Sequence, residues 1–219
     1  MIVAHPDDET LGCGGTIRKN VEYGNEVFVL VLSNGVGSRD SGVIDSDEIK
    51  RRSQNLDEAC AILGVSQYRL LNFPDNKFDS VPLLDIVQSI EAFKKEFGFF
   101  DRVYTHFWGD LNLDHALTCK AVNIAFRPCS GSDVSEILCF EILSSTEWGY
   151  ESEWFRPSVF VDIENQLENK IKAIKCYDTE LRTFPHPRSV AAIEALARTR
   201  GSVVGYGAAE AFVPIRLFG

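Results

Sequence analysis

Short apolar runs alternate with longer amphipathic segments along the first half of the chain. Runs at residues 2–4, 26–33, 68–72, 101–105 and 136–143 have the length of strands, and 26–33 is the clearest buried one. Apolar residues recur at helical spacing in segments 10–23, 47–63, 83–97 and 114–126. Gly24 and Gly64 follow two of these segments and predict helix ends. Strands that alternate with helices predict an α/β fold with a mainly parallel sheet.

The last third of the chain has a less regular pattern. It predicts a helix near 164–177, a loop at 183–188, a helix at 189–199 and a strand at 212–217, while residues 34–45 read as a Gly/Ser/Asp loop. A chain of 219 residues suffices for one domain, so we predict a single domain over 1–219. The first strand is very short, so we expect the natural chain to begin upstream of Met1.

Composition narrows the classes of partner. Hydrophobic residues make up 45% of the chain, and the formal net charge is -10. This balance argues against nucleic acid or an anionic membrane surface as a partner, because both require basic patches. No apolar run is long enough to span a bilayer. Six scattered cysteines without a C-x-x-C pair predict reduced, mostly buried thiols and a cytoplasmic location, and disfavour a disulfide protein.

A histidine and three acidic residues follow the first predicted strand. The string A-H-P-D-D-E-T spans residues 4–10 and leads into a helix, which is where open α/β sheets place their sites. Imidazole and carboxylate both bind zinc, so His5 and Asp8 are candidate ligands. Asp7 is then the candidate general base for a water that zinc activates. The ordinary alternative, acids that merely favour a helix N-terminus, does not account for His5.

A second cluster, T-H-F-W-G-D-L-N-L-D-H, follows the strand at 101–105. A catalytic zinc usually has three protein ligands and one open position, and His106 or His115 can supply the third. We favour His115, because the helix start and Asp114 place it on the rim facing the first cluster. Asp110 and Asp114 are candidates for hydrogen bonds that orient the imidazoles. A structural histidine is the ordinary alternative, and two such clusters on one sheet disfavour it.

Three glycines, Gly12, Gly14 and Gly15, form the string L-G-C-G-G in the first helix. Their spacing matches neither a dinucleotide-binding nor a phosphate-binding loop. We therefore expect them to allow close packing between helix and strand.

Several strings occur in a fixed order between residues 2 and 122. They are A-H-P-D-D-E-T, L-G-C-G-G-T, R-R-x4-D-E-A-x3-L-G-V, F-P-D and T-H-x3-D-x3-D-H. Together they resemble the LmbE/PIG-L family of zinc deacetylases, which remove the acetyl group from N-acetylglucosamine-type groups.

The resemblance implies a Rossmann-like three-layer αβα sandwich and a hydrolase acting on a small N-acetylated amino sugar. It implies that His5, Asp8 and His115 bind Zn²⁺ and that Asp7 is the general base. It also implies that Arg52 and Asp75 contact the substrate. The same ligand set also accepts iron, manganese or cobalt. Oligomers are common in the family, so a homo-oligomer is one of the expected states.

One position departs from the family pattern. The family usually has H-P-D-H where this chain has N-L-D-H, so Asn112 replaces a histidine, beside Asp114. Asn112 can donate a hydrogen bond to an oxyanion but cannot deliver a proton. His186, between two prolines, is our candidate for the missing histidine, within the subunit or across an oligomer interface. A stiff surface loop with Ser189 as a helix N-cap is the ordinary alternative.

Two further residues are candidates for substrate contacts. Arg188 follows the F-P-H-P string and either binds a phosphate or carboxylate or is solvated. Trp148 follows a predicted strand and either stacks on a sugar ring or packs partly buried.

Two other classes of function stay open. One is a nucleotide- or sugar-binding Rossmann-like module without catalysis, although such a module does not need two His/Asp clusters. The other is a metal-dependent amidase or esterase with a non-sugar substrate, which would use the same metal site and differ only in its pocket.

Overall fold

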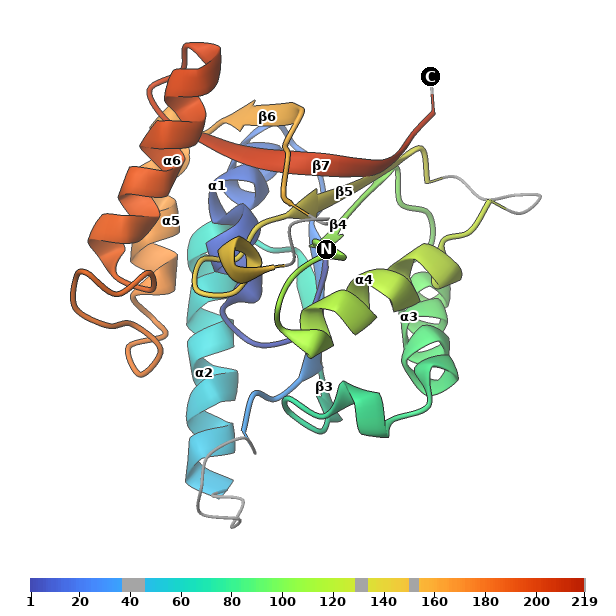
Figure 1. The fold of residues 1–219 in the computed structure, drawn as a ribbon. Helices are drawn as coiled ribbons and strands as arrows, with labels where there is room; N and C mark the ends of the chain where they lie inside the picture. Colours follow the sequence, from blue (N-terminus) through green and yellow to red (C-terminus); the bar gives the residue numbers. More distant parts are fainter. Residues whose placement is uncertain (37–45, 129–133, 150–153, 219) are drawn as a thin grey trace.

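The buried apolar runs form the strands of two adjoining sheets (Figure 1). The computed structural model describes residues 1–36, 46–128, 134–149 and 154–218, so most of the predicted 34–45 loop lies outside the described residues. The first sheet is parallel in the order β1-β2-β3: β1 (Ile2–Val3), β2 (Phe28–Ser33) and β3 (Gln67–Phe73). The second has the order β4-β5-β7-β6: β4 (Arg102–His106), β5 (Glu136–Phe140), β6 (Val159–Asp162) and β7 (Ala209–Leu217).

The two sheets meet where β1 packs beside β4. At this junction the backbone N–H of Ala4 donates to Nε2 of His106 at 2.9 Å. The chain winds from β1 to β2 and β3 in one direction, and from β4 to β5 in the other. The carboxyl ends of β1 and β4 therefore flank a topological switch point, the usual ligand-binding place of an open α/β sheet.

Helices cover both faces of these sheets (Figure 1). One layer contains α1 (Asp8–Glu22), α2 (Ser46–Leu63), α5 (Leu167–Ile174) and α6 (Val190–Val204). The other contains α3 (Leu83–Phe97) and α4 (Leu113–Ala125). Successive residues of β2 belong to different cores, Val29 and Val31 to the first layer and Leu30 and Leu32 to the second, because strand side chains alternate between faces. The predicted three-layer αβα architecture is confirmed, and among the described strands the antiparallel pairs are those that β7 makes with β5 and β6.

The packing of α1 explains the glycines in its first half. A Cβ on Gly12 would lie 2.3 Å from the Phe140 ring, and one on Gly15 would lie 2.7 Å from Ile163. Close packing, as predicted, is the reason for both. Gly24 and Gly64 have φ values of 83° and 80° and follow the ends of α1 and α2, as the sequence predicted.

The last third of the chain differs most from its prediction. The sequence analysis did not predict β6, and β7 begins at Ala209 rather than near residue 212. Buried Glu210 interrupts the apolar pattern of β7: its carboxylate accepts the N–H groups of Gly15 and Thr16 and pairs with Lys170. A long-range contact therefore stabilises this part of β7, and local hydrophobicity does not reveal it.

The cysteines agree with the prediction of reduced thiols. The five that the structure describes are free, and four of them are buried, while Cys129 lies outside the described residues. Among the residues that the structure describes, no helix is both long and apolar enough to cross a membrane.

Candidate active site

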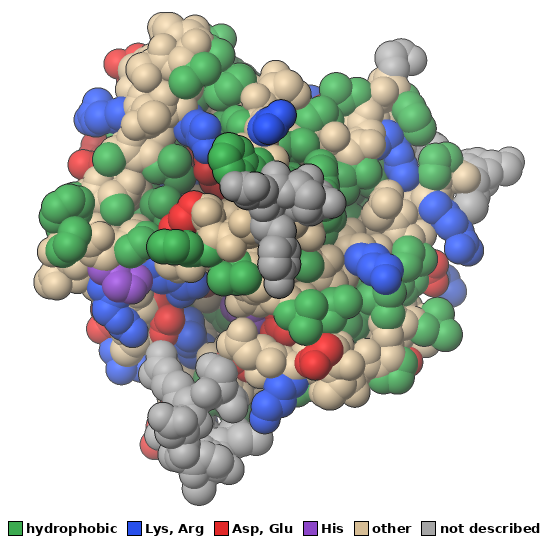
Figure 2. Space-filling view, viewed as in Figure 1, with side chains coloured by type: hydrophobic (Ala, Val, Ile, Leu, Met, Phe, Trp, Pro, Cys, Tyr) green, Lys and Arg blue, Asp and Glu red, His purple; other side chains and the backbone are tan. Residues whose placement is uncertain are grey.

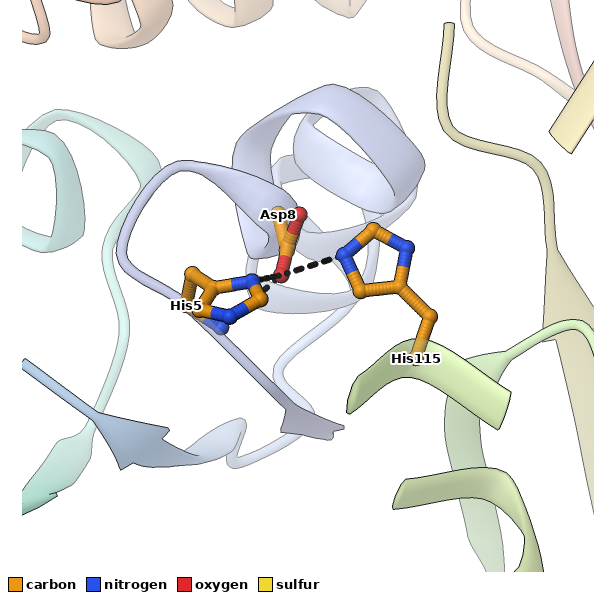
Figure 3. A group of neighbouring side chains, drawn as sticks. All are labelled: His5, Asp8 and His115. Carbon is orange, nitrogen blue, oxygen red and sulfur yellow. Dashed lines mark hydrogen bonds and ion pairs between the residues drawn. The ribbon is translucent and has the colours of Figure 1, made fainter. Parts of the chain in front are cut away.

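The turn after β1 and the start of α4 bring three predicted metal ligands together. His5 lies in the turn, Asp8 opens α1, and His115 lies in the first turn of α4 (Figure 3). One ligand atom from each residue lies within 4.8 Å of the other two. The Oδ2 atom of Asp8 is 3.4 Å from Nδ1 of His5 and 3.5 Å from Nε2 of His115.

The second nitrogen of each of these imidazoles faces a carboxylate. Nε2 of His5 lies 3.0 Å from Oδ2 of Asp114, and Nδ1 of His115 lies 3.2 Å from Oδ1 of Asp110. A carboxylate in this position holds the proton on the nitrogen it faces and leaves the other nitrogen free to bind a metal. The free nitrogens are those that face Asp8. Carboxylate–histidine–metal centres have the same relation between carboxylate and imidazole.

Buried polar atoms in the cluster lack hydrogen-bond partners. Oδ1 of Asp8 and Nε2 of His115 are buried and make no hydrogen bond within the protein; Nδ1 of His115 makes none either, although it lies 3.2 Å from Asp110. Such atoms are costly unless something satisfies them. A cation bound between Asp8, His5 and His115 would satisfy both, and the donor set of two imidazoles and one carboxylate suits zinc. The residues present therefore fit a divalent metal.

The electrostatics of the cluster also call for positive charge. Burial lowers the pKa of His5, but Asp114, Asp8 and Asp75 outweigh it and raise the pKa to about 10. Burial likewise opposes a charge on His115, yet Asp8 and Asp110 raise its pKa to about 9. Without a metal, the carboxylates thus recruit protons to these rings. A bound divalent ion would replace those protons, which is the usual linkage between metal binding and proton release.

His106 has a different environment from His115, although the two rings stack with centroids 3.9 Å apart. Its Nε2 accepts the N–H of Ala4, so that lone pair is already used. Burial, with the charge of His115, lowers the pKa of His106 to about 4. The environment of His106 favours a neutral ring that is bonded to the backbone, and His115 remains the predicted third ligand.

Asp110 and Asp114 are themselves held in place. Asp114 accepts the backbone N–H of Asn76 at 2.7 Å and that of Phe78 at 3.0 Å. Asp110 accepts the backbone N–H of Asn112 at 2.8 Å and the hydroxyls of Ser145 and Thr146. These bonds connect the cluster to the loops after β3 and β5.

Asp7 lies beside the metal ligands and contacts an arginine from the last third of the chain. Nη1 of Arg188 is 3.1 Å from Oδ2 of Asp7, and Nε of Arg188 donates to the hydroxyl of Ser144 at 3.0 Å. Burial raises the pKa of Asp7 to about 7, against the effect of the Arg188 guanidinium. The Arg188 contact fixes the direction of the Asp7 carboxylate.

A second arginine joins this network through a glutamate. Arg52 is buried, and its Nη2 lies 2.8 Å from Oε1 of Glu180, while Oε2 of Glu180 lies 3.6 Å from Nη1 of Arg188. Arg52 also donates to the carbonyls of Pro6 and Gly35. The turn that carries His5 and Asp7 is thus bound on one side by Arg52 and on the other by Arg188.

A pocket of about 100 Å³ opens above these residues. Its lining combines the predicted base, four predicted contact residues and their neighbours: His5, Pro6, Asp7, Gly35, Arg52, Asp75, Asn76, Asn112 and Arg188. One predicted ligand, His5, therefore shares an opening with the predicted base and polar contacts, while Asp8 and His115 lie buried behind it.

Unusual backbone conformations concentrate at this site. Among the described residues, the non-glycine residues with positive φ are Asp7 (112°), Asn76 (53°) and Ser144 (80°). Each one supports the site: Asp7 is the candidate base, Asn76 donates to Asp114, and Ser144 accepts from Arg188. Such conformations are costly and cluster at functional sites.

Two predicted residues, His186 and Trp148, lie outside both the His/Asp cluster and the pocket lining. His186 is exposed, and its Nδ1 accepts the backbone N–H of Arg188 at 3.0 Å. Its neighbour Ser189 caps α6, as the alternative interpretation of this loop predicted. Trp148 is 69% exposed, which contradicts the packing alternative for this residue. Asn112 lines the pocket and also caps α4 by accepting the N–H of Asp114.

Sequence reasoning missed several residues that support the site. Asn76 lines the pocket, and Glu180 and Ser144 contact the arginines of its lining; all three stand outside the strings that carry the family resemblance. Glu9 is a further supporting residue: its carboxylate accepts the N–H of Asp7 at 3.1 Å and the hydroxyl of Tyr177 at 2.7 Å. Asn76 carried one signal, its place in the Pro-Asp-Asn loop, because asparagine tolerates positive φ.

Comparison with known proteins places this site in a family. The PIG-L profile, described as GlcNAc-PI de-N-acetylase, matches residues 1–126, more than half of the chain. The chain belongs to the PIG-L family. An uncharacterised deacetylase of Escherichia coli, YaiS, is 31% identical over 181 residues, which cover 80% of this chain and 86% of YaiS. The diacetylchitobiose deacetylase of Thermococcus kodakarensis is 28% identical over 185 residues, covering 82% and 68%.

Solved structures share the PIG-L fold of this chain. The N,N'-diacetylchitobiose deacetylase of Pyrococcus horikoshii aligns with a TM-score of 0.78 at 22% identity, covering 98% of this chain and 82% of that one. GalB, a 4-carboxy-2-hydroxymuconate hydratase of Pseudomonas putida, also gives 0.78 at 20% identity, covering 100% and 96%. Proteins with this fold therefore catalyse more than one reaction, and the site must decide the chemistry.

Proposed function

We propose that this PIG-L protein is a zinc-dependent hydrolase that removes the acetyl group from an N-acetylated amino sugar. The observation that carries the proposal is the arrangement of His5 and His115, each with one nitrogen toward Asp8 and the other against a carboxylate. The buried candidate base Asp7 adjoins this cluster at the pocket.

His5, Asp8 and His115 are the residues that would hold the metal. Three protein ligands leave a position open for substrate or water. A divalent ion bound there supplies Lewis acidity, which polarises the amide carbonyl and lowers the pKa of water. Asp114 and Asp110 keep the imidazoles of His5 and His115 oriented toward the place of the metal.

Asp7 acts as the general base in this proposal. Its carboxylate takes a proton from the attacking water, and the contact with Arg188 keeps the carboxylate aimed at the pocket. Glu9 holds the backbone N–H of the same residue, so both the side chain and the backbone of Asp7 are fixed. A preorganised base needs little rearrangement as the reaction proceeds.

Two groups serve the later steps. One N–H of the Asn112 side chain donates to Oδ1 of Asn76 at 3.3 Å, and the other is a donor for the developing oxyanion. The leaving amine receives its proton either from Asp7, which then returns the proton that it took from the water, or from His186. The exposed position of His186 favours Asp7 for this role.

The pocket lining suits a hydroxyl-rich substrate. Arg52, Asp75 and Arg188 present charged donors and acceptors around an opening large enough for an acetamido group and part of a sugar ring. Trp148, exposed on the loop after β5, is a candidate to stack on a further sugar ring. The similar enzyme from Thermococcus kodakarensis is a diacetylchitobiose deacetylase, which makes that disaccharide the first compound to test.

The test measures acetate release by protein stripped with a chelator and then reloaded with zinc. Diacetylchitobiose and N-acetylglucosamine serve as substrates, with the stripped protein as the control for metal dependence. Acetate release that requires zinc supports the proposal. If neither compound is turned over but an N-acetyl amide of another class is, the protein is an amidase with a non-sugar substrate. Binding of sugars without any turnover would indicate a non-catalytic module.

A further inference from the structure

The pocket that contains Asp7 has an unusual charge balance. The described side chains in and directly behind the pocket include two guanidinium groups, those of Arg52 and Arg188. They also include six carboxylates: Asp7, Asp8, Asp75, Asp110, Asp114 and Glu180. A divalent ion between His5, Asp8 and His115 still leaves two negative formal charges in excess, and one if a carboxylate carries a proton.

Both arginines in the pocket lining are already engaged. Arg188 contacts Asp7 at 3.1 Å and Glu180 at 3.6 Å, and Arg52 contacts Glu180 at 2.8 Å. The carboxylates of Asp7 and Glu180 neutralise the guanidinium charges that would otherwise attract an anionic ligand. The face of the molecule in Figure 2 likewise shows basic and acidic side chains interspersed. A phosphate or carboxylate on the substrate would therefore have to break an existing ion pair before it could bind the guanidinium of Arg52 or Arg188.

We infer that the enzyme selects electrically neutral N-acetyl glycosides over conjugates that carry a phosphate or carboxylate next to the acetamido sugar. The inference rests on the proposed deacetylase function and deepens it. Like charges brought together in a poorly solvated pocket strongly disfavour the wrong partner. The deacetylated product carries an ammonium group, and the excess negative charge stabilises it.

The direct test compares two substrates that differ mainly in charge. Methyl N-acetyl-α-glucosaminide is neutral, and N-acetyl-α-glucosamine 1-phosphate is its anionic counterpart. The zinc-loaded enzyme should release acetate from the neutral compound with a kcat/KM about tenfold or more above that for the phosphate. Equal values, or a preference for the phosphate, would overturn the inference.

A binding measurement separates this inference from the proposed function. The two deacetylated products are titrated into the zinc-loaded protein by calorimetry. Tighter binding of the methyl glycoside, which lacks the phosphate, supports the charge inference even if neither substrate is hydrolysed, in which case the proposed function fails. Equal or tighter binding of the phosphate contradicts the inference whether or not acetate is released.

A charge variant identifies the source of the selectivity. Glu180→Gln removes the carboxylate that both arginines share, so the phosphate should gain several-fold relative to the neutral substrate. Glu168→Gln is the matched control, because it removes the same charge from an exposed pair with Lys172 on α5. The control should leave the ratio unchanged. An unchanged ratio in Glu180→Gln as well would overturn the assignment of selectivity to this network.

Discussion

The first 126 residues and the last third of the chain contribute to the site in different ways. The first part supplies the proposed ligands and the proposed base from two short strings, each at the carboxyl end of a strand. The last third supplies single residues, Glu180 and Arg188, which reach the site through long-range contacts. The metal cluster is thus local to strand ends, whereas the orientation of the base depends on the tertiary fold.

This difference separates two parts of the proposed chemistry. Changes to the strand-end strings should alter metal binding or proton transfer. Changes to the last third should alter the direction of Asp7 and the selectivity for charge while metal content stays the same. Each variant below tests one side of that division.

The largest loss of turnover with zinc retained is expected for Asp7→Asn. The amide keeps the shape of the side chain but cannot accept the proton, so turnover should fall on the order of 10²–10⁴-fold. Acetate release and zinc content are measured on the same preparation. Loss of zinc from this variant would mean that the ligand and the base have been assigned the wrong way round.

The next largest effect is expected for Asp110→Asn. Asp110 faces Nδ1 of His115, and removing such a carboxylate costs about 10–100-fold in metal affinity or activity. Competition with a chromogenic zinc chelator gives the affinity. Asp85→Asn is a matched control, because Asp85 is an exposed acid on α3. Equal affinities for both variants would contradict the role given to Asp110.

Arg188→Ala tests the contribution of the last third. Without its guanidinium, Asp7 loses its directional contact, and we expect kcat to fall about tenfold at unchanged zinc content. Arg200→Ala is the control, since it also removes a paired arginine, but from Glu141 and outside the pocket lining. Recovery of part of the activity with added guanidinium would identify a positioning role. A loss of zinc in Arg188→Ala would instead tie the arginine to the metal cluster.

The smallest effect is expected for His186→Ala. Its ring is exposed and hydrogen-bonds to its own loop, so turnover should change by less than about threefold. A proton donor in this position would cost on the order of 10²-fold or more. A loss of that size, especially one that depends on protein concentration, would restore His186 as the general acid and indicate a contribution across an oligomer interface.

The sequence predicts the fold and the proximity of His5, Asp8 and His115 because their signals are local. The H-P-D-D string follows a strand, His115 opens a helix, and parallel strands bring their carboxyl ends to one edge. It missed β6 and the start of β7, where Glu210 and Lys170 form a buried pair that interrupts the apolar pattern. It also left Arg188 as a substrate contact, because nothing in its neighbourhood reveals the ion pair with Asp7.

Zinc content after stripping and reloading, compared between wild type and His115→Ala, is the most direct test of the proposed metal centre. We predict close to one tightly bound zinc per chain in the wild type and its loss, or great weakening, in the variant. Circular dichroism checks that the variant is folded. No tight zinc in the wild type, or equal zinc in both proteins, would contradict the metal centre formed by His5, Asp8 and His115.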